Sequence, residues 1–462
     1  MHRKTSILFN TDSYKVSMYA QYPSDTTRVY SYLEARGPEH DHIVFFGLQA
    51  FIKAYLLTPI TQQEIDEAAV FFQTHGVPFH KAGWQRILEV HHGYVPVTIR
   101  AVPEGSVVPI RRPLVTVVNN DPELPWITTW IETALVRACW YPSTVATKDF
   151  YLRQTIDAAL IQSGDPSGAV FKVHDFGARG ASSFESASIG GAAHLLFFAG
   201  TDTISGVTYL MDYYEAPVSG FSIPAAEHST IIAWGKDHEQ DAYQNMLDQF
   251  ATPGAILAVV SDSYDIYHAA EELWGTQLQQ AIIDSKATLV IRPDSGDAID
   301  VNATLVQMLA KKFGTTTNDK GYKVLNHVRL IQGDGVDEAV IEQVIERFLD
   351  LGYSIDNIAF GMGAGLLQKV HRDQLGFAMK ASAIERRGLW QDVFKDPVSD
   401  DFKASKKGRV TLIYDGEHYH TGQVGDPHDV LESVYQDGKC LKNERFEAIQ
   451  ARAIEGLKKH RS

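Results

Sequence analysis

The sequence contains few cysteines and no long hydrophobic run, and each absence excludes a class of protein. Its 462 residues include only two cysteines, Cys139 and Cys440. Two cysteines cannot form a disulfide framework, so a reducing compartment is the simplest expectation. The apolar run near the amino end, within MHRKTSILFN, is too short for a signal peptide, and no apolar stretch approaches the roughly 18 residues of a membrane span. We therefore expect a cytoplasmic protein that does not cross a membrane.

Basic residues are too few for a protein that binds nucleic acid. The formal net charge is -15 at pH 7, whereas proteins that bind nucleic acid carry basic faces. An acidic protein that binds phosphate must gather its cations locally. One basic segment appears late, in KDPVSDDFKASKKGR. This segment is either a solvated loop or a clamp for phosphate.

Neither of the common nucleotide-binding loops is present. No GxxxxGK[ST] motif occurs, and FGMGAGLLQK lacks the third glycine of a dinucleotide fingerprint because Leu366 stands there. Two glycine-rich turns remain, one at Gly333 and Gly335 and one at Gly361 and Gly363. Backbone N–H groups in such turns can bind a phosphate where a helix begins. Either turn alone could be only a tight turn, but two at successive strand ends favour a phosphate site.

A pattern of strands and helices repeats from about residue 170. Short β-branched or aromatic runs end in polar clusters, and helical stretches such as DEAVIEQVIERFLDL separate them. This alternation predicts a parallel sheet, and six or seven units imply a barrel or a large open sheet. In a barrel, residues just beyond the strands line the active site. The expected run ends are Asp175, Asp202, His228, Asp262, Asp294, Asp334 and Gly363.

The two ends of the chain have a different character from its middle. They mix helices with short alternating strands, such as VPVTIRAVPEG and GRVTLIYDGEHYH. We predict an α/β protein in which residues 151–384 form the barrel. Residues 1–150 form a second, mixed α/β domain, with residues 385–462 packed on it.

Three carboxylates that follow apolar runs are candidates for a sugar or metal site. Asp262, Asp294 and Asp334 would share one face of a barrel, where their oxygens could hold ribose hydroxyls or Mg²⁺. Arg292, two residues before Asp294, offers the cation that a phosphate requires. Each aspartate could instead be a helix N-cap.

Other candidates are ambiguous from their spacing alone. His228 begins a predicted helix without the second histidine of a zinc motif, and Asp202 is equally suited to capping a helix. Phe176, Tyr14 and His174 fit packing roles. The residues therefore predict a barrel enzyme for a small phosphorylated, sugar-containing substrate, and they do not name its reaction.

The motifs taken in order resemble those of the nicotinamide phosphoribosyltransferase family. They run from about residue 11 to 410 and include TDSYK, FGLQ, VPEG, TTWIET, HDFGARG, GTDT, PAAEHST, VVSDSYDIY, IRPDSG, IQGDGVD, IAFGMGAGLLQK and SKKGR. The resemblance implies an irregular α/β barrel of the type II phosphoribosyltransferase kind. It also implies a homodimer, with active sites at the subunit interface, that joins nicotinamide to 5-phosphoribosyl 1-pyrophosphate in NAD salvage.

The resemblance assigns the base-binding residues. Phe176 and Tyr14 of the partner subunit would sandwich the pyridine ring. Asp202 would accept a hydrogen bond from the carboxamide NH₂, and Arg179 would donate one to the carboxamide oxygen.

The resemblance also assigns the catalytic and phosphate-binding residues. The histidine matching His228 is phosphorylated by ATP, and Glu227 and Asp262 could orient its ring. Asp294 would bind ribose, and Asp262 with Asp294 would hold Mg²⁺. The expected phosphate-binding residues are Arg292, Gly333, Asp334, Gly363 and Ala364, together with Arg372, Lys380, Lys395 and Lys403 of the partner subunit.

Three departures from the family pattern concern affinity rather than the reaction. Met362 replaces a small polar residue, Ala178 stands where the family often has tyrosine, and Ala378 replaces a serine.

Three alternatives remain open. A nicotinate phosphoribosyltransferase would share the fold and chemistry, but the charge of Asp202 would repel a nicotinate carboxylate. A sugar-phosphate aldolase would require a reactive lysine at a strand end, for which Lys172 is the candidate. A nucleotide-binding or signalling protein without turnover is the third.

Overall fold

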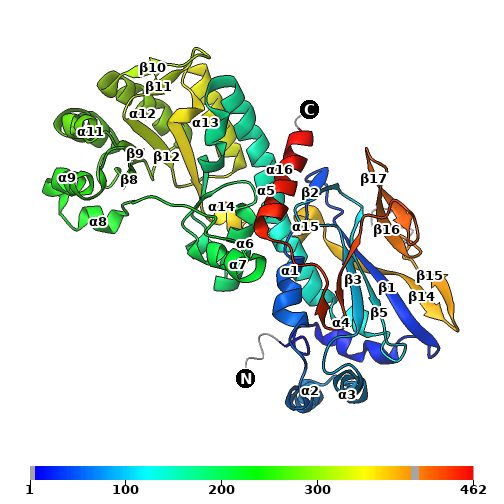
Figure 1. Ribbon diagram of the computed structural model, residues 1–462. Coiled ribbons are helices and arrows are strands. Elements are labelled where there is room, and N and C mark those ends of the chain that lie inside the picture. The colour runs from blue at the N-terminus through cyan, green and yellow to red at the C-terminus, as the bar shows by residue number, and fades with distance from the viewer. Residues whose placement is uncertain (1–5, 397–404, 461–462) are drawn as a thin grey trace.

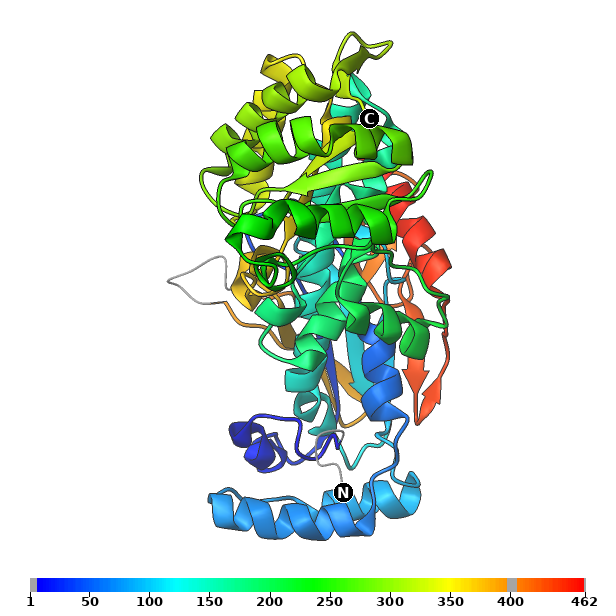
Figure 2. The same ribbon diagram turned by 90° about the vertical axis from the view of Figure 1, so that its left-hand side faces the viewer.

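A computed structural model describes residues 6–396 and 405–460, and it divides them between two sheets. A parallel sheet wrapped in helices forms one lobe, and an antiparallel sheet forms the other (Figure 1). The long helix α5 (Glu132–Ser163) and the last helix α16 (Phe446–Lys459) lie between the two lobes. Figure 2 shows the same two lobes from the side, with the helices of residues 62–90 at the end farthest from the parallel sheet.

The parallel sheet is a barrel whose strands follow one another in sequence order. The strands are β6 (Val173–Asp175), β7 (Gly200–Thr201), β8 (Ile256–Val260), β9 (Thr288–Arg292), β12 (Val328–Gln332) and β13 (Ile358–Met362). They are arranged as β7-β6-β13-β12-β9-β8, so β13 pairs with β6 although β6 comes first in the chain.

One extended segment closes the gap between β7 and β8. Phe221 bridges to Gly200 of β7, and Ala225 bridges to Ala258 of β8, both in parallel. The backbone N–H groups of Thr201 and Ala258 donate to this segment at 2.9 Å each. The six strands and this segment together close the barrel, which confirms the predicted irregular α/β barrel.

Helices connect successive strands of the barrel, as is usual between parallel strands. The helices of this lobe are η4 (Pro166–Phe171), η5 (Ala178–Gly180), α6 (Phe184–His194), α7 (Ile204–Tyr214), α8 (His228–Ile232), η6 (Lys236–His238), α9 (Glu239–Phe250), α10 (Ile266–His268), η7 (Ala269–Gln277), α11 (Gln279–Ser285), α12 (Ala298–Phe313), α13 (Glu338–Asp350), η8 (Ile355–Asn357) and α14 (Ala364–Leu367). A small hairpin of β10 (Thr315–Thr317) and β11 (Lys323–Leu325) follows α12.

The antiparallel sheet combines strands from both ends of the chain. In spatial order its strands are β15 (Leu389–Asp392), β14 (Ala378–Arg386), β1 (Thr26–Glu34), β5 (Pro113–Asn119), β3 (Val97–Ala101), β18 (Glu432–Gln436) and β19 (Lys439–Cys440). Strand β1 lies between β5 and β14, so the first and last parts of the chain share one sheet. This arrangement confirms the predicted second domain built from both termini.

Two hairpins and several helices complete this lobe. The hairpins are β2 (His42–Val44) with β4 (Val107–Pro109) and β16 (Val410–Tyr414) with β17 (Tyr419–Gln423). The helices are η2 (Ser13–Ala20), α1 (Leu48–Phe51), η3 (Ile52–Leu56), α2 (Gln62–His75), α3 (Lys81–Val90), α4 (Ile127–Trp130) and α15 (Arg372–Leu375), whose Leu375 lies in the core of this lobe. We keep the division of the chain at residues 150 and 384 as a proposal. Helix α5 spans the first of these positions and β14 the second.

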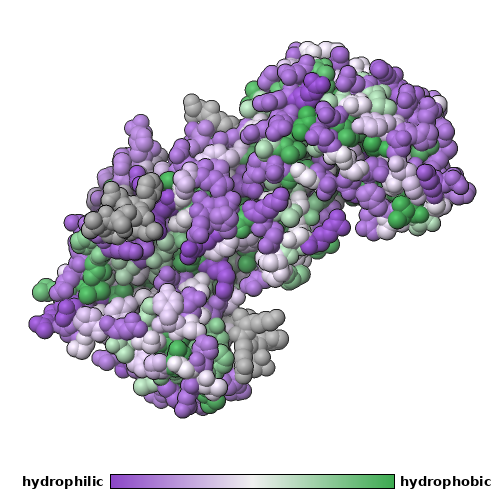
Figure 3. All heavy atoms as spheres, turned by 180° about the vertical axis from the view of Figure 1, so that it is seen from behind, coloured by the Kyte–Doolittle hydropathy of each residue, from purple (hydrophilic) through white to green (hydrophobic). Residues whose placement is uncertain are grey.

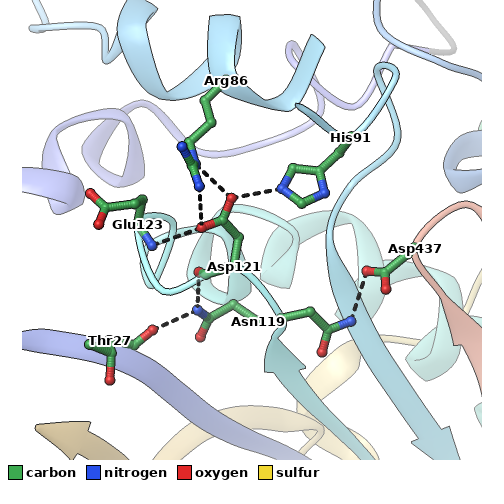
Figure 4. Close-up of polar contacts among 8 residues, drawn as sticks. Thr27, Arg86, His91, Asn119, Asp121, Glu123 and Asp437 are labelled. Carbon is green, nitrogen blue, oxygen red and sulfur yellow. Dashed lines mark hydrogen bonds and ion pairs between the residues drawn. The ribbon is translucent and has the colours of Figure 1, made fainter. Parts of the chain in front are cut away.

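A buried polar node connects α3 to the antiparallel sheet. Asp121 accepts hydrogen bonds from Arg86 Nε at 2.6 Å and from the Glu123 backbone N–H at 3.0 Å, and its carboxylate lies 2.7 Å from His91 Nε2 (Figure 4). Burial would raise the pKa of Asp121, but these donors outweigh it, so the pKa lies below its usual value. The side chain of Asn119 donates to the carbonyls of Thr27 and Asp121 and so fixes the turn beneath. These bonds tie the end of α3 to the segment that follows β5.

The surface is mostly hydrophilic on the face that Figure 3 shows, and its hydrophobic residues gather in small patches. Large apolar side chains fill two separate cores, one under each sheet. Each fully buried side chain of this size contributes about 1.5–3 kcal/mol. Within residues 6–396 and 405–460, no helix is both long and apolar enough to cross a membrane.

Candidate active site

The six strands and the closing segment end at one mouth of the barrel, and a candidate residue lies at or just beyond each end. Asp175 ends β6, Asp202 follows β7, and His228 follows the closing segment. Asp262, Asp294, Asp334 and Gly363 come one or two residues after β8, β9, β12 and β13. The strand ends that we predicted are therefore confirmed, and parallel pairing brings them to one end of the barrel.

The aspartates after β8, β9 and β12 do not cap the helices that follow. The caps of α10, α12 and α13 are Asp265, Asp297 and Asp337, whose carboxylates accept backbone N–H bonds. Each cap comes three residues after one of the candidate aspartates, Asp262, Asp294 and Asp334. The capping interpretation thus fails for these three carboxylates.

His228 lies between two of these carboxylates. Its Nε2 is 2.9 Å from Asp262 Oδ1, and its Nδ1 is 4.0 Å from Asp294 Oδ2. The other oxygen of Asp262 accepts a 2.5 Å hydrogen bond from Ser295, a residue that sequence reasoning missed. The His228 side chain is 42% exposed and Asp262 only 4%, so the ring faces the mouth while its partner is held behind it. Glu227 accepts instead from Ser229 and is exposed.

The environment of Asp294 favours a cation. Burial raises the pKa of Asp294 above its usual value; Asp262 and Asp334 raise it further, while Arg292 acts in the opposite direction. Mg²⁺ in such sites takes one or two carboxylates and completes its shell with water and substrate phosphate. The part of the chain that the structure describes contains no group of three or more side chains able to cage a metal alone. Asp262 and Asp294 therefore fit an ion that a phosphate substrate helps to bind.

Arg292 presents an unused donor at the same mouth. Its Nε is 3.6 Å from Asp294 Oδ1, too far for a hydrogen bond, and this buried Nε has no hydrogen-bond partner among the described residues. A buried guanidinium N–H without a partner is costly. A phosphate oxygen at this position would satisfy it.

Phe176 lies over the inner wall of the barrel, where two glycines leave room for it. A Cβ on Gly361 would stand 2.0 Å from its ring, and one on Gly333 would stand 3.5 Å from it. The ring also packs against Ala258, Val290 and Ile331 from three neighbouring strands. Gly361 and Gly333 thus serve ring packing as well as the turns that we predicted from them.

Asp202 is held as an anion by two neighbours that the sequence did not single out for this role. His174 Nε2 lies 3.0 Å from Asp202 Oδ1, and Ser222 donates to the same oxygen at 2.5 Å. Burial raises the pKa of Asp202, but the hydrogen bonds from His174 and Ser222 outweigh it, so the net shift is downward. The His174 ring also lies 5.1 Å from the Phe176 ring, so one histidine contacts both Asp202 and Phe176.

The glycine-rich turns stand at the ends of β12 and β13. Gly335 has a φ of 67°, and the exposed Asp334 beside it points its charge toward the mouth, where it raises the pKa of Asp294. Gly363 precedes α14, whose first residue Ala364 is exposed. Met362 is fully buried, so this departure from the family pattern alters the packing behind the turn.

A second group of cations lies on the antiparallel sheet. Lys380 on β14 pairs with Tyr32 on β1, and burial, Arg36 and Lys395 all lower its pKa. Lys406 forms an ion pair with the buried Glu34 of β1. Exposed Lys395 and Arg372 lie at the ends of this region, and Lys403 lies outside the described residues. Arg36 and Lys406 are cations that our sequence analysis did not assign.

Tyr14 and Arg179 are both exposed, on different lobes. Tyr14 is 60% exposed on η2, beside the antiparallel sheet, whereas Arg179 lies on η5 immediately after Phe176. An adjacent cavity of about 670 Å³ is lined by Ser182 and Phe184 of the segment after Arg179, with aromatic residues of η3, α5 and α7. Within one chain, Tyr14 and Phe176 thus lie in different lobes.

Lys172 is not available for Schiff-base chemistry. It is buried, and its Nζ donates to the carbonyls of Ile355 and Ile358 at 2.7 and 3.0 Å. Burial lowers its pKa to about 8, but those carbonyls precede or begin β13, at the end of the barrel opposite the mouth. The geometry excludes the aldolase interpretation.

Comparisons with known proteins identify the family of this chain. Residues 171–440 match the model of the nicotinate phosphoribosyltransferase (NAPRTase) family, and residues 6–99 match the nicotinamide phosphoribosyltransferase N-terminal domain. A nicotinamide phosphoribosyltransferase of Xanthomonas campestris pv. campestris is 49% identical over 98% of this chain and 99% of its own. One from Acinetobacter baylyi is 32% identical over 97% of each chain.

Solved structures show the same fold at low sequence identity. Nicotinate-nucleotide pyrophosphorylase of Pyrococcus furiosus superposes with a TM-score of 0.66, at 15% identity over 99% of this chain and 97% of that one. Human nicotinic acid phosphoribosyltransferase gives 0.58, at 15% identity over 97% and 93%. The barrel with carboxylates at its mouth, the two family models and the full-length relatives lead to one conclusion: this chain belongs to the nicotinamide phosphoribosyltransferase family.

Proposed function

We propose that this protein transfers the phosphoribosyl group of 5-phosphoribosyl 1-pyrophosphate to nicotinamide, giving nicotinamide mononucleotide and pyrophosphate. The observation that carries the proposal is Asp202, an anion held by Ser222 and by His174, which also contacts Phe176. A carboxylate there accepts the carboxamide NH₂ of nicotinamide and repels the carboxylate of nicotinate. The curated relatives with this name support the same base.

The chemistry follows from the residues at the mouth. Phe176 stacks on the pyridine ring, and Asp202 with Arg179 orients its carboxamide, so that the ring nitrogen faces the anomeric carbon of the ribose. The C–N bond forms as the C–O bond to pyrophosphate breaks, and positive charge develops on the sugar. Asp294 stabilises this charge and binds the ribose, and Arg292 binds phosphate. Gly333, Asp334, Gly363 and Ala364 surround the 5′-phosphate end. Mg²⁺ at Asp262 and Asp294 would neutralise pyrophosphate charge.

His228 is proposed as a phosphoryl acceptor for ATP. Its 2.9 Å contact with Asp262 favours a proton on Nε2, which leaves the Nδ1 lone pair as the nucleophile. Attack of Nδ1 on the terminal phosphorus forms the N–P bond and releases ADP. Glu227 stays a candidate for orienting this helix start through Ser229.

The site is proposed to be completed by a second copy of the chain. Tyr14 and the cations Arg372, Lys380 and Lys395 lie on the antiparallel-sheet lobe, whereas Phe176 and Arg292 belong to the barrel lobe. In a homodimer, Tyr14 of the partner subunit would close the base pocket, and the cations of the partner subunit would bind phosphate. Lys403, outside the described residues, belongs to the same proposal. With two unpaired cysteines, the cytoplasm is the proposed location.

A paired turnover assay tests the reaction and the base. Purified protein with Mg²⁺ and 5-phosphoribosyl 1-pyrophosphate is given nicotinamide or nicotinate, and each mononucleotide is measured. We expect product from nicotinamide alone, and Asp202→Asn should reduce this preference by about tenfold or more, since one charge contact is worth roughly 2 kcal/mol. Wild-type preference for nicotinate would support the alternative enzyme, and binding without turnover would support the non-enzymatic one.

The role of His228 is tested by adding ATP to the same assay. His228→Ala should abolish stimulation by ATP while retaining basal transfer, because the phosphoryl acceptor is gone and the base pocket is intact. A phosphohistidine in the wild-type protein, detected by acid-labile ³²P from γ-labelled ATP, is expected. Stimulation that survives in the variant would disprove the assignment.

A further inference from the structure

Behind the base pocket lies a charged pair that the reaction does not touch. Asp149 on α5 and His194 at the end of α6 are both fully buried, with 2.8 Å between Asp149 Oδ2 and His194 Nδ1. The other ring nitrogen of His194 is 3.2 Å from the carbonyl oxygen of Gly200 in β7. A carbonyl only accepts hydrogen bonds, so this Nε2 carries a proton. The ring therefore links two helices to the shortest strand of the barrel.

The electrostatics of the pair agree with a proton held between its members. Burial lowers the pKa of His194, but Asp149 more than offsets it, and the net shift is upward. Burial also raises the pKa of Asp149, whose Oδ1 has no hydrogen-bond partner among the described residues. A buried pair of this kind adds little stability over an apolar pair of the same size, and its best-attested use is to fix one arrangement of the chain.

The arrangement that it fixes is that of Asp202. β7 has only two residues, Gly200 and Thr201, and Asp202 follows at once. Gly200 also touches His174, because a Cβ added to it would stand 2.6 Å from His174 Nδ1. His174 is the residue whose Nε2 contacts Asp202. The position of the Gly200 peptide thus sets both the start of the Asp202 loop and the ring that holds the Asp202 carboxylate.

We propose that His194 is a positioning residue for the base pocket, acting through its hydrogen bond to the Gly200 carbonyl, with Asp149 holding the ring in place. Asp202 also depends on β6, since its backbone N–H donates to the Asp175 carbonyl at 2.9 Å. Loss of the His194 bond leaves β7 paired with β6 but free to shift relative to α6. This shift weakens the binding of nicotinamide rather than that of phosphoribosyl pyrophosphate, because Arg292 and Asp294 lie at the end of a different strand.

Two amide substitutions separate the two bonds of His194. The amide nitrogen of asparagine lies where His Nδ1 lies, and that of glutamine where Nε2 lies. His194→Asn therefore keeps a donor toward Asp149 and loses the bond to Gly200, whereas His194→Gln keeps the bond to Gly200. Both remove one hydrogen bond and one ring, so both should lower the melting temperature. The double variant Asp149→Asn/His194→Gln removes the unpaired carboxylate, should the single glutamine variant fail to fold.

The test measures the two substrates separately and rests on the proposed function. We expect His194→Asn to raise the KM for nicotinamide, and its Kd by calorimetry, about tenfold, since misplacing a binding group by a fraction of an ångström carries costs of this order. The KM for phosphoribosyl pyrophosphate should change less than about twofold. The glutamine variant, single or double, should bind nicotinamide within about twofold of wild type.

Equal loss of nicotinamide binding in the asparagine and glutamine variants would overturn the proposal, and so would an equal rise in the KM of both substrates. A wild-type protein that neither binds nor turns over nicotinamide would instead refute the proposed function, so the two failures are distinguishable.

Discussion

At the residue scale, each site carboxylate is given a different charge behaviour by its neighbours. Asp202 has donors on one oxygen and a lowered pKa, as a base-binding anion requires. The pKa of Asp294 is raised. Among the described side chains, the Nε of Arg292 lies 3.6 Å from its carboxylate, too far for a hydrogen bond. One oxygen of Asp262 contacts His228, and the other accepts a hydrogen bond from Ser295. Under the proposed function, the same residue type would therefore serve recognition, cation binding and ring orientation, according to what surrounds it.

The raised pKa of Asp294 predicts a conflict between stability and activity. A carboxyl whose folded pKa is raised destabilises the folded state when it is charged, so its cost is present at neutral pH and disappears as pH falls through that pKa. Asp294→Asn should therefore stabilise the ligand-free protein at pH 7 by about 0.5–1 kcal/mol, and should reduce kcat by about 100-fold or more. Thermal unfolding at pH 7 and pH 4.5 measures the first effect, and the advantage of the variant should shrink at the lower pH.

Asp334→Asn is the matched control for this prediction, since that side chain is exposed beside the same site. Its stability should be unchanged to within about 0.5 kcal/mol. A loss of stability in Asp294→Asn would mean that its attraction to Arg292 exceeds the burial cost.

At the scale of elements, the barrel is closed by a segment that is barely a strand. Residues 221–226 pair with β7 and β8 through two isolated bridges. Their side chains are mostly exposed, so this segment is not covered on both faces as strands of a parallel sheet usually are. The position of His228 beyond this segment depends on those bridges. The sequence pattern predicted that an apolar run ends before His228, but it did not show how the barrel closes.

The close approach of β13 to Phe176 gives a prediction at this scale. Gly361→Ala places a methyl group 2.0 Å from the ring carbon, so the ring must leave the wall on which it lies. The KM for nicotinamide should rise about tenfold or more, with a loss of about 1–3 kcal/mol in stability from overpacking. Steady-state kinetics and denaturant unfolding measure the two effects.

Gly168→Ala serves as the control for this substitution, because a Cβ there meets nothing within 4 Å and the position lies in η4, outside the mouth. Equal kinetics for the two alanine variants would show that Phe176 can be displaced without harm.

At the scale of the whole molecule, the distribution of cations is the main feature. A chain of net charge -15 places Arg292 at the barrel mouth and gathers Lys380, Lys395 and Lys406 on the other lobe. Burial lowers the pKa of Lys380, and the nearby charges of Arg36 and Lys395 lower it further. A bound anion relieves this repulsion. Under the proposed function, each lobe would supply part of a phosphate site, as a site shared between subunits requires.

Mixing two inactive variants tests the shared site. Lys380→Ala and Asp294→Asn are each expected to be inactive, since each removes one part of every site. If sites combine the barrel of one subunit with the sheet of its partner, half of randomly mixed dimers carry one intact site out of two. The mixture, after co-refolding or co-expression, should recover about a quarter of wild-type activity. Activity no higher than that of the separate variants would place each site within one chain.

The sequence by itself determined the alternation of strands and helices, the strand ends and the family motifs. These depend on local patterning, in which a buried strand ends where apolar residues give way to Asp, Gly and Ser. It did not distinguish a capping aspartate from a site aspartate, because both follow a strand and only the hydrogen bonds of Asp265, Asp297 and Asp337 separate them.

Only the tertiary structure decided the partners that give each residue its chemistry. His174, Ser222 and Ser295 acquire their roles from contacts with residues 28, 20 and 33 positions away. Asp149 and His194 meet 45 residues apart, behind a strand of two residues. Hydrogen bonds and charges act over a few ångströms of space, whereas sequence records distance along the chain. The fold therefore brings the strand ends that the sequence indicates into contacts that no local pattern contains.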